Sequence, residues 1–124
     1  MSKKNISPAP CEIEIQSMVS SDVDEIWNWN APDPKNVFFE LTLTIGCKKA
    51  LGGNNFSLLV ASHNQTFRQM TSDDKRFLLR FDTYSFEALT ERLNTIIQEC
   101  QSADWQGSVD QLRTRFHWEY EGYK

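Results

Sequence analysis

The stretch Val37-Phe38-Phe39-Glu40-Leu41-Thr42-Leu43-Thr44-Ile45 decides the fold, because apolar residues recur at every second one of its nine positions. Successive side chains of a β-strand point to opposite faces of the sheet. The pattern therefore predicts a strand with one buried and one largely solvated face. The expected buried side chains are Val37, Phe39, Leu41, Leu43 and Ile45.

More strands are expected on both sides of this stretch. Residues 11–16 alternate in the same way, and residues 56–61 read as a strand that returns after the turn-forming residues 52–55. The nearly continuous apolarity of residues 77–81 favours a central strand that is covered on both faces. Residues 117–121 alternate again and predict a short last strand. Residues 64–70 could hold one or two helical turns.

Two helices are expected in the second half of the chain. Apolar residues from 86 to 100 recur at helical spacing, and Thr83 or Ser85 could cap the start of this helix. A second helix is expected at residues 104–115, and the capping-box pattern from Ser108 to Gln111 suggests that its regular part begins there. Strands followed by helices predict an α+β fold, with a mostly antiparallel four- to five-stranded sheet and two C-terminal helices packed on one face.

The length of 124 residues fits one domain, expected at residues 11–124 after a flexible leader at residues 1–10. The leader is basic but has no apolar stretch behind it, so it does not read as a signal peptide, and we expect a cytoplasmic protein. Three widely spaced cysteines, Cys11, Cys47 and Cys100, form no metal-binding or disulfide pattern. We expect all three to be reduced thiols.

The net charge of −4 disfavours binding to nucleic acid or to an anionic membrane. The sequence has none of the common phosphate-binding, metalloprotease or nucleophile-elbow motifs, so no cofactor, metal or enzymatic activity is expected. One alternative is a small ligand-binding domain or enzyme with a site near His63 and Arg68. A nucleophile–base pair of His63 with Cys47 or Cys100 has no support in the local sequence. Another alternative is an adaptor that dimerises through its sheet, with Phe38 or Leu59 exposed.

An acidic stretch stands out from the rest of the chain. Six acidic residues and no lysine or arginine lie between Glu12 and Asp33, and two tryptophans, Trp27 and Trp29, lie among them. Exposed tryptophans can anchor a protein partner while carboxylates steer its approach, although at least one of the two is expected to fold back onto the core. The candidate partner-binding residues are Asp22, Asp24, Glu25, Trp27 and Asp33, with a weaker second cluster at Glu119 and Glu121.

Several of these residues occur in an order that resembles a known family. The features are Trp29, Pro32-Asp33-Pro34, Phe39, Ile45-Gly46, Phe56 to Val60, Tyr84, Trp105 and the ending Trp118-Glu119-Tyr120-Glu121-Gly122-Tyr123. From about Cys11 to Tyr123 the chain resembles the Immunity protein 8 family of bacterial polymorphic-toxin systems. Gly122 departs from the resemblance, since an aspartate is expected there.

The resemblance implies a protein that is not an enzyme and that binds the C-terminal effector domain of a toxin in the cytoplasm. Such toxins are often nucleases, including those delivered by contact-dependent growth inhibition. The acidic composition agrees with this, because the substrate cleft of a nuclease is basic. The resemblance assigns no contact residues, and the sequence leaves the oligomeric state open.

Overall fold

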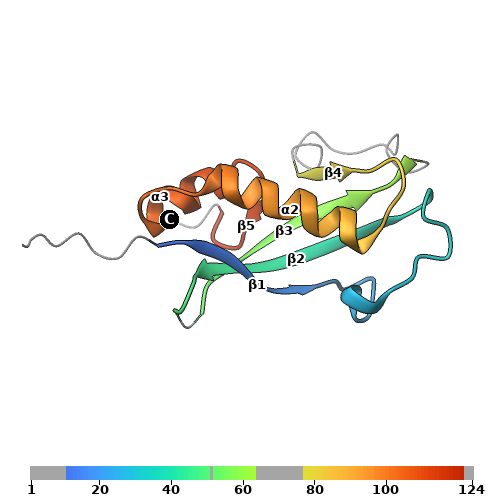
Figure 1. Ribbon diagram of the computed structural model, residues 1–124, viewed down its shortest axis with the longest axis horizontal. Coiled ribbons are helices and arrows are strands. Elements are labelled where there is room, and N and C mark those ends of the chain that lie inside the picture. The colour runs from blue at the N-terminus through green and yellow to red at the C-terminus, as the bar shows by residue number, and fades with distance from the viewer. Residues whose placement is uncertain (1–10, 51, 64–76, 122–124) are drawn as a thin grey trace, which may run out of the picture.

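The computed structural model describes residues 11–50, 52–63 and 77–121 (Figure 1). Its elements confirm the expected α+β fold and follow in the order β1 (Ile13–Val19), a 3₁₀ helix η1 (Ile26–Asn28), β2 (Phe38–Cys47), β3 (Asn54–Ala61), β4 (Leu78–Arg80), α2 (Phe86–Cys100), α3 (Trp105–Leu112) and β5 (His117–Trp118). The expected leader and the possible helical turns at residues 64–70 lie outside the described residues.

The sheet is mostly antiparallel, in the order β1-β2-β3-β4, and β5 also pairs with β3. Strand β4 runs parallel to β3 opposite Leu59 to Ala61, whereas β5 runs antiparallel to it opposite Phe56 and Ser57. The two short strands thus share one edge of β3. The expectation that residues 77–81 form a central strand is wrong: Leu79 is buried, but Leu78 is only half-buried and Arg80 is exposed.

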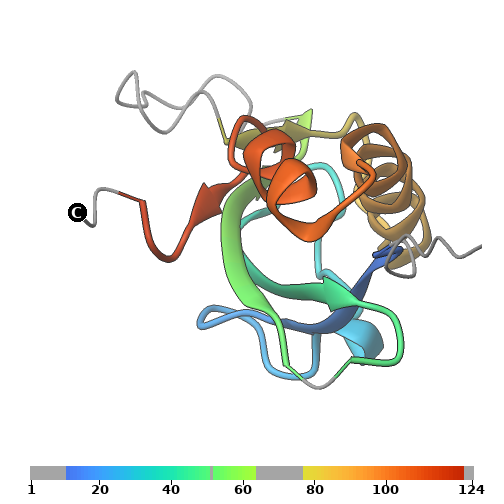
Figure 2. The same ribbon diagram turned by 90° about the vertical axis from the view of Figure 1, so that its left-hand side faces the viewer.

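The core lies between one face of the sheet and the two helices, which Figure 2 shows on the same side of the curved sheet. The expected buried face of β2 is confirmed, since Phe39, Leu41, Leu43 and Ile45, with Val37 just before the strand, are at most 3% exposed. Helix α2 packs its expected stripe into the same core, through Leu89, Leu93, Ile96, Ile97 and Cys100.

The helix starts are set by single side chains. Ser85, rather than Thr83, caps α2 by accepting a hydrogen bond from the backbone N–H of Ala88 at 3.0 Å. Asp104 caps α3 by accepting from Gly107 at 2.8 Å, so the expected start at the Ser108 capping box is wrong. Ser108 is buried instead, and its hydroxyl accepts from the backbone N–H of Ser102 at 2.9 Å.

The cysteines differ from the expectation of three reduced thiols. Cys11 and Cys47 form a disulfide with their Cα atoms 5.2 Å apart, and only Cys100 is free and buried. The antiparallel register of β1 and β2 explains the pairing, because Ile13 lies opposite Cys47 and brings Cys11 diagonally across from it. Among the described residues, no helix is long and apolar enough to span a bilayer.

Candidate functional site

In the acidic loop between β1 and β2, buried residues that anchor the loop alternate with residues whose side chains are exposed to solvent. Val23 and Ile26 are buried in the core, whereas Asp24, Glu25 and Trp27 are exposed. Trp27 is the most exposed large apolar side chain among the described residues, at 58%. Two buried anchors this close together hold the loop in one conformation, so its exposed side chains are displayed at fixed positions.

Hydrogen bonds hold the loop at several further points. One Asp22 carboxylate oxygen accepts from the backbone N–H of Glu40 at 2.9 Å, which ties the loop to β2. Asp33 accepts from the backbone N–H of Lys35 at 3.1 Å and stabilises the turn before β2. Glu25 has φ 47°, a left-handed conformation that is uncommon for residues other than glycine, asparagine and aspartate. The backbone N–H of Asn28 donates to its carbonyl at 2.8 Å, which closes the turn of η1.

Trp29 takes the other role expected for one of the two tryptophans, because it folds back onto the core. Its ring centroid lies 5.7 Å from that of Phe39 and 5.6 Å from that of Tyr84. Tyr84 also packs edge-on against Phe39 at 5.6 Å. This three-ring cluster closes the end of the core and connects the acidic loop to the start of α2.

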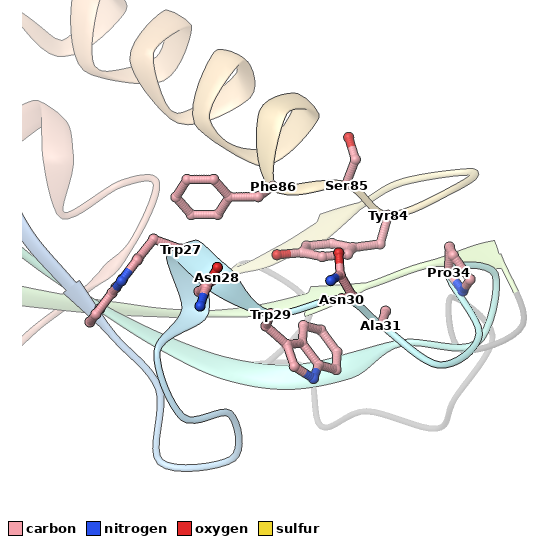
Figure 3. Close-up of a pocket in the computed structure, with 9 residues that line it drawn as sticks. All are labelled: Trp27, Asn28, Trp29, Asn30, Ala31, Pro34, Tyr84, Ser85 and Phe86. Carbon is pink, nitrogen blue, oxygen red and sulfur yellow. The ribbon is translucent and has the colours of Figure 1, made fainter.

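A hollow of about 300 Å³ opens beside this cluster (Figure 3). Four aromatic residues, Trp27, Trp29, Tyr84 and Phe86, and two amides, Asn28 and Asn30, make up most of its lining. Ala31, Pro34 and Ser85 complete it. We call this feature the aromatic hollow. It brings together the loop between β1 and β2 and the start of α2, segments that lie about fifty residues apart in the sequence.

The Tyr84 hydroxyl is an unpaired polar group at the aromatic hollow. Tyr84 is 4% exposed, and its hydroxyl has no hydrogen-bond partner among the described residues. Burial raises the pKa of this phenol to about 12, so the hydroxyl stays protonated at neutral pH. In Figure 3 it points toward Asn28, inside the ring of lining side chains. Buried polar groups in folded proteins are nearly always paired, so this one requires an explanation.

The structure gathers some of the candidate partner-binding residues and separates others. Asp24, Glu25 and Trp27 lie together and are exposed, and within the described ranges neither carboxylate has a hydrogen bond or an ion pair. Asp22 and Asp33 are exposed in the same loop, but their carboxylates hold backbone groups. Glu119 and Glu121 follow β5, a strand that lies well away from η1 in Figures 1 and 2.

The second acidic cluster is engaged within the chain. Glu119 accepts from the backbone N–H of Asn55 at 2.5 Å, across the pairing of β3 with β5. Glu121 forms a two-pronged ion pair with Arg113, whose guanidinium lies 4.9 Å from the Trp118 ring centroid. The hydrogen bond to Glu121 raises the pKa of Arg113. These carboxylates are therefore less available to a partner than those of Asp24 and Glu25.

The alternative site near His63 gains little from the structure. His63 is exposed, with Nδ1 3.5 Å from an Asp82 carboxylate oxygen, and Arg68 lies outside the described residues. Cys47 is bonded to Cys11, and burial raises the pKa of the Cys100 thiol, so neither is an activated thiolate. Within residues 11–50, 52–63 and 77–121, no cluster of three or more histidine, cysteine or acidic residues could hold a metal ion.

The alternative of a dimerising adaptor needed exposed apolar residues on the solvated face of the sheet. Phe38 and Leu59 on that face are both half-buried. The exposed large apolar side chains of the described residues are instead Val19, Trp27 and Tyr120.

Comparison with known proteins connects this geometry to a family. The model of the Immunity protein 8 family matches residues 13–123, nearly the whole chain. The chain belongs to the Immunity protein 8 family. It is thus an immunity protein directed against a toxin, and the acidic loop and the aromatic hollow are candidate contacts for that toxin. No curated protein and no solved structure gave a significant match to the chain.

Sequence reasoning found the exposed members of this site but not the hollow. Trp27, Asp24 and Glu25 were identified because they lie in the acidic stretch that has no lysine or arginine. Asn28, Asn30 and Phe86 carried no signal, and Tyr84 was noted only as part of the family resemblance. Their convergence depends on long-range packing, such as the bond from the backbone N–H of Tyr84 to the Pro34 carbonyl at 2.8 Å.

Proposed function

We propose that this chain neutralises its toxin by stoichiometric, charge-complementary binding, without catalysis, and that the toxin domain is a basic nuclease. A nuclease must hold a polyanion, so its substrate cleft carries a positive potential. A protein of net charge −4 complements such a surface and competes with the nucleic acid for it.

The observation that supports this proposal most directly is the pair of uncommitted carboxylates beside an exposed tryptophan. Asp24 and Glu25 have no ionic partner among the described residues, and Trp27 next to them is 58% exposed. Tryptophan is enriched among the residues that dominate binding energy, and unpaired rim charges accelerate encounter with an oppositely charged partner. Because Val23 and Ile26 hold the loop, little conformational entropy is lost on binding.

The other candidate residues have secondary roles in the proposed interface. Asp22 and Asp33 add to the negative potential of the loop while their carboxylates stabilise its shape. Glu119 and Glu121 would contribute as a separate, weaker contact, because each is already engaged within the chain.

We further propose that the complex forms in the cytoplasm, where a nuclease would meet its substrate. The Cys11–Cys47 disulfide is an observation against this location, because structural disulfides are rare in the cytosol. Trapping of thiols in intact cells, followed by fractionation, tests the location. A chain found oxidised and only outside the cytoplasm would contradict it.

The decisive experiment is co-expression with the toxin domain encoded beside this chain. We expect a one-to-one complex, loss of toxicity, and inhibition of DNA or RNA cleavage by the purified toxin domain. Association rates measured over a range of salt concentrations should fall steeply as salt rises, because screening weakens attraction between opposite charges.

Charge-reversal variants identify the surface that causes this salt dependence. Glu25→Lys should slow association about threefold to tenfold and flatten the salt dependence. The matched control is Glu91→Lys, which makes the same charge change on the exposed side of α2. If both variants slow association equally, net charge alone explains the salt dependence. If Glu25→Lys does not change the association rate, the interface lies elsewhere on the chain. A toxin domain without nuclease activity would refute the proposed target.

A further inference from the structure

We infer that the aromatic hollow receives the guanidinium group of an arginine on the toxin surface. This assignment names one contact of the complex proposed above and therefore rests on that proposed function. The proposed ligand of the hollow is thus a cationic side chain, rather than an anionic, aliphatic or nucleotide ligand.

The lining of the hollow suits a planar cation. Trp27, Trp29, Tyr84 and Phe86 offer aromatic rings from two separate segments of the chain. Guanidinium groups stack on such rings, and tryptophan is the strongest partner for a cation. Described parts of the chain already make this contact, because Arg92 lies 5.1 Å from the Phe81 ring centroid and Arg113 lies 4.9 Å from that of Trp118.

The polar atoms of the hollow also fit a group rich in N–H donors. Asn28 and Asn30 contribute amide oxygens, and the Tyr84 hydroxyl oxygen is an acceptor without a partner among the described residues. Arginine carries five N–H donors and no acceptor, so it can satisfy several acceptors at once. An aliphatic side chain would leave all of them unpaired, at a cost for each buried group.

Charge around the hollow favours a cation. Four acidic residues lie within two positions of lining residues, namely Glu25, Asp33, Asp82 and Glu87, against a single base, Lys35. These carboxylates would repel an anion such as a nucleotide phosphate. The volume of about 300 Å³ is at the lower end of the range for small-molecule pockets, which suits one long side chain better than a cofactor.

A small-molecule probe tests the hollow without the toxin. The probe is N-acetyl-arginine amide, and its neutral control is N-acetyl-citrulline amide, which has nearly the same shape. The indole N–H signals of the four tryptophans are followed by NMR during each titration. Trp27 and Trp29 line the hollow, whereas Trp105 and Trp118 do not and serve as internal controls.

We expect the arginine probe to shift the Trp27 and Trp29 signals with a dissociation constant of about 1–10 mM, as for a single side chain without the rest of an interface. The citrulline probe should bind at least about fivefold more weakly, because it lacks the charge. Equal shifts with both probes, or equal shifts at all four tryptophans, would overturn the assignment.

The complete complex tests the same contact at full affinity. Trp27→Ala should leave the melting temperature unchanged, because the side chain is 58% exposed, but should weaken toxin binding about thirtyfold or more. The comparison variant is Tyr120→Ala, which removes an exposed aromatic residue beside the weaker contact at Glu119 and Glu121 and should therefore lower affinity less than threefold. Tyr84→Phe keeps the ring and removes only the hydroxyl, and it should weaken binding about threefold to tenfold.

The two levels of the proposal fail in different ways. If the wild-type chain neutralises the toxin and Trp27→Ala does so with equal affinity, the hollow is not the arginine site, while the proposed function stands. If the wild-type chain does not bind the toxin domain, the proposed function fails, and the arginine contact of that complex fails with it. If the complex forms but no toxin arginine gives the same loss on substitution to alanine, the assignment of arginine is overturned.

Discussion

Removal of the Cys11–Cys47 disulfide is expected to lower the free energy of unfolding by about 4 kcal/mol. The two cysteines are 36 residues apart in the sequence. Cross-linking a loop of this length restricts the unfolded chain by about 13 cal/mol/K, which corresponds to about 4 kcal/mol at room temperature. Single domains have stabilities of about 5–15 kcal/mol, so this one bond is a large fraction of the total.

The Cys47→Ser variant should nevertheless fold, because other contacts hold the start of β1. The Gln101 side chain accepts from the backbone N–H of Ile13 at 2.8 Å and donates to the Cys11 carbonyl at 2.6 Å. The backbone N–H of Lys48 donates to the Glu12 carbonyl at 2.7 Å. These bonds keep the register of β1 without the disulfide, so the loss of stability comes mainly from the unfolded state.

Urea unfolding followed by tryptophan fluorescence measures this effect. Dithiothreitol should lower the midpoint of the wild-type chain to that of Cys47→Ser and leave the variant unchanged. Titration of thiols in the unfolded, unreduced wild-type chain should find a single reactive thiol, that of Cys100. Three reactive thiols and identical midpoints for wild type and Cys47→Ser would refute the reasoning.

Three further predictions concern the start of α2. Tyr84→Phe should raise the stability of the free protein by about 1 kcal/mol, because it removes a buried hydroxyl without a partner among the described residues, and thermal unfolding measures this gain. Because burial raises the pKa of Tyr84 from 10 to about 12, the unfolded chain loses this proton first as pH rises. The stability of the wild type relative to Tyr84→Phe should therefore be constant below about pH 10 and fall by roughly 2 kcal/mol as pH rises through about 12, as urea unfolding at each pH would show. Ser85→Ala should cost about 1 kcal/mol in urea unfolding, because it removes the N-cap, whereas Thr83→Ala should cost less than half as much; equal costs would contradict the assignment of the cap.

The sheet was predictable where a short sequence pattern determines burial. Alternation from Val37 to Ile45 marks one face of β2 as apolar. The five apolar side chains on that face are all buried, namely Val37, Phe39, Leu41, Leu43 and Ile45. The position of residues 77–81 was not predictable in this way. An apolar run can belong to a central strand or to an edge strand beneath helices, and α2 supplies the cover here by placing Arg92 over Phe81.

The candidate site was predictable in composition but not in arrangement. The two tryptophans of the acidic loop look alike in sequence, and only packing decides that Trp29 meets Phe39 and Tyr84 while Trp27 stays outside. The disulfide was missed for a related reason. Pairing of Cys11 with Cys47 requires the antiparallel register of β1 and β2, which a count and spacing of cysteines do not contain.

The position of the disulfide relative to the site has a functional consequence. In the antiparallel pair of β1 and β2, the start of β1 and the end of β2 carry the two cysteines at one end. Helix η1 follows the end of β1, at the opposite end of the pair (Figure 1). Its residues Trp27 and Asn28 line the aromatic hollow, which therefore lies at that end as well. Reduction should therefore change the stability of the chain far more than its affinity for the toxin. An immunity protein with this layout would bind its toxin in a reducing or an oxidising compartment, provided that the remaining stability keeps it folded. Toxin affinity that falls on reduction by as much as stability does would show that the two ends are coupled.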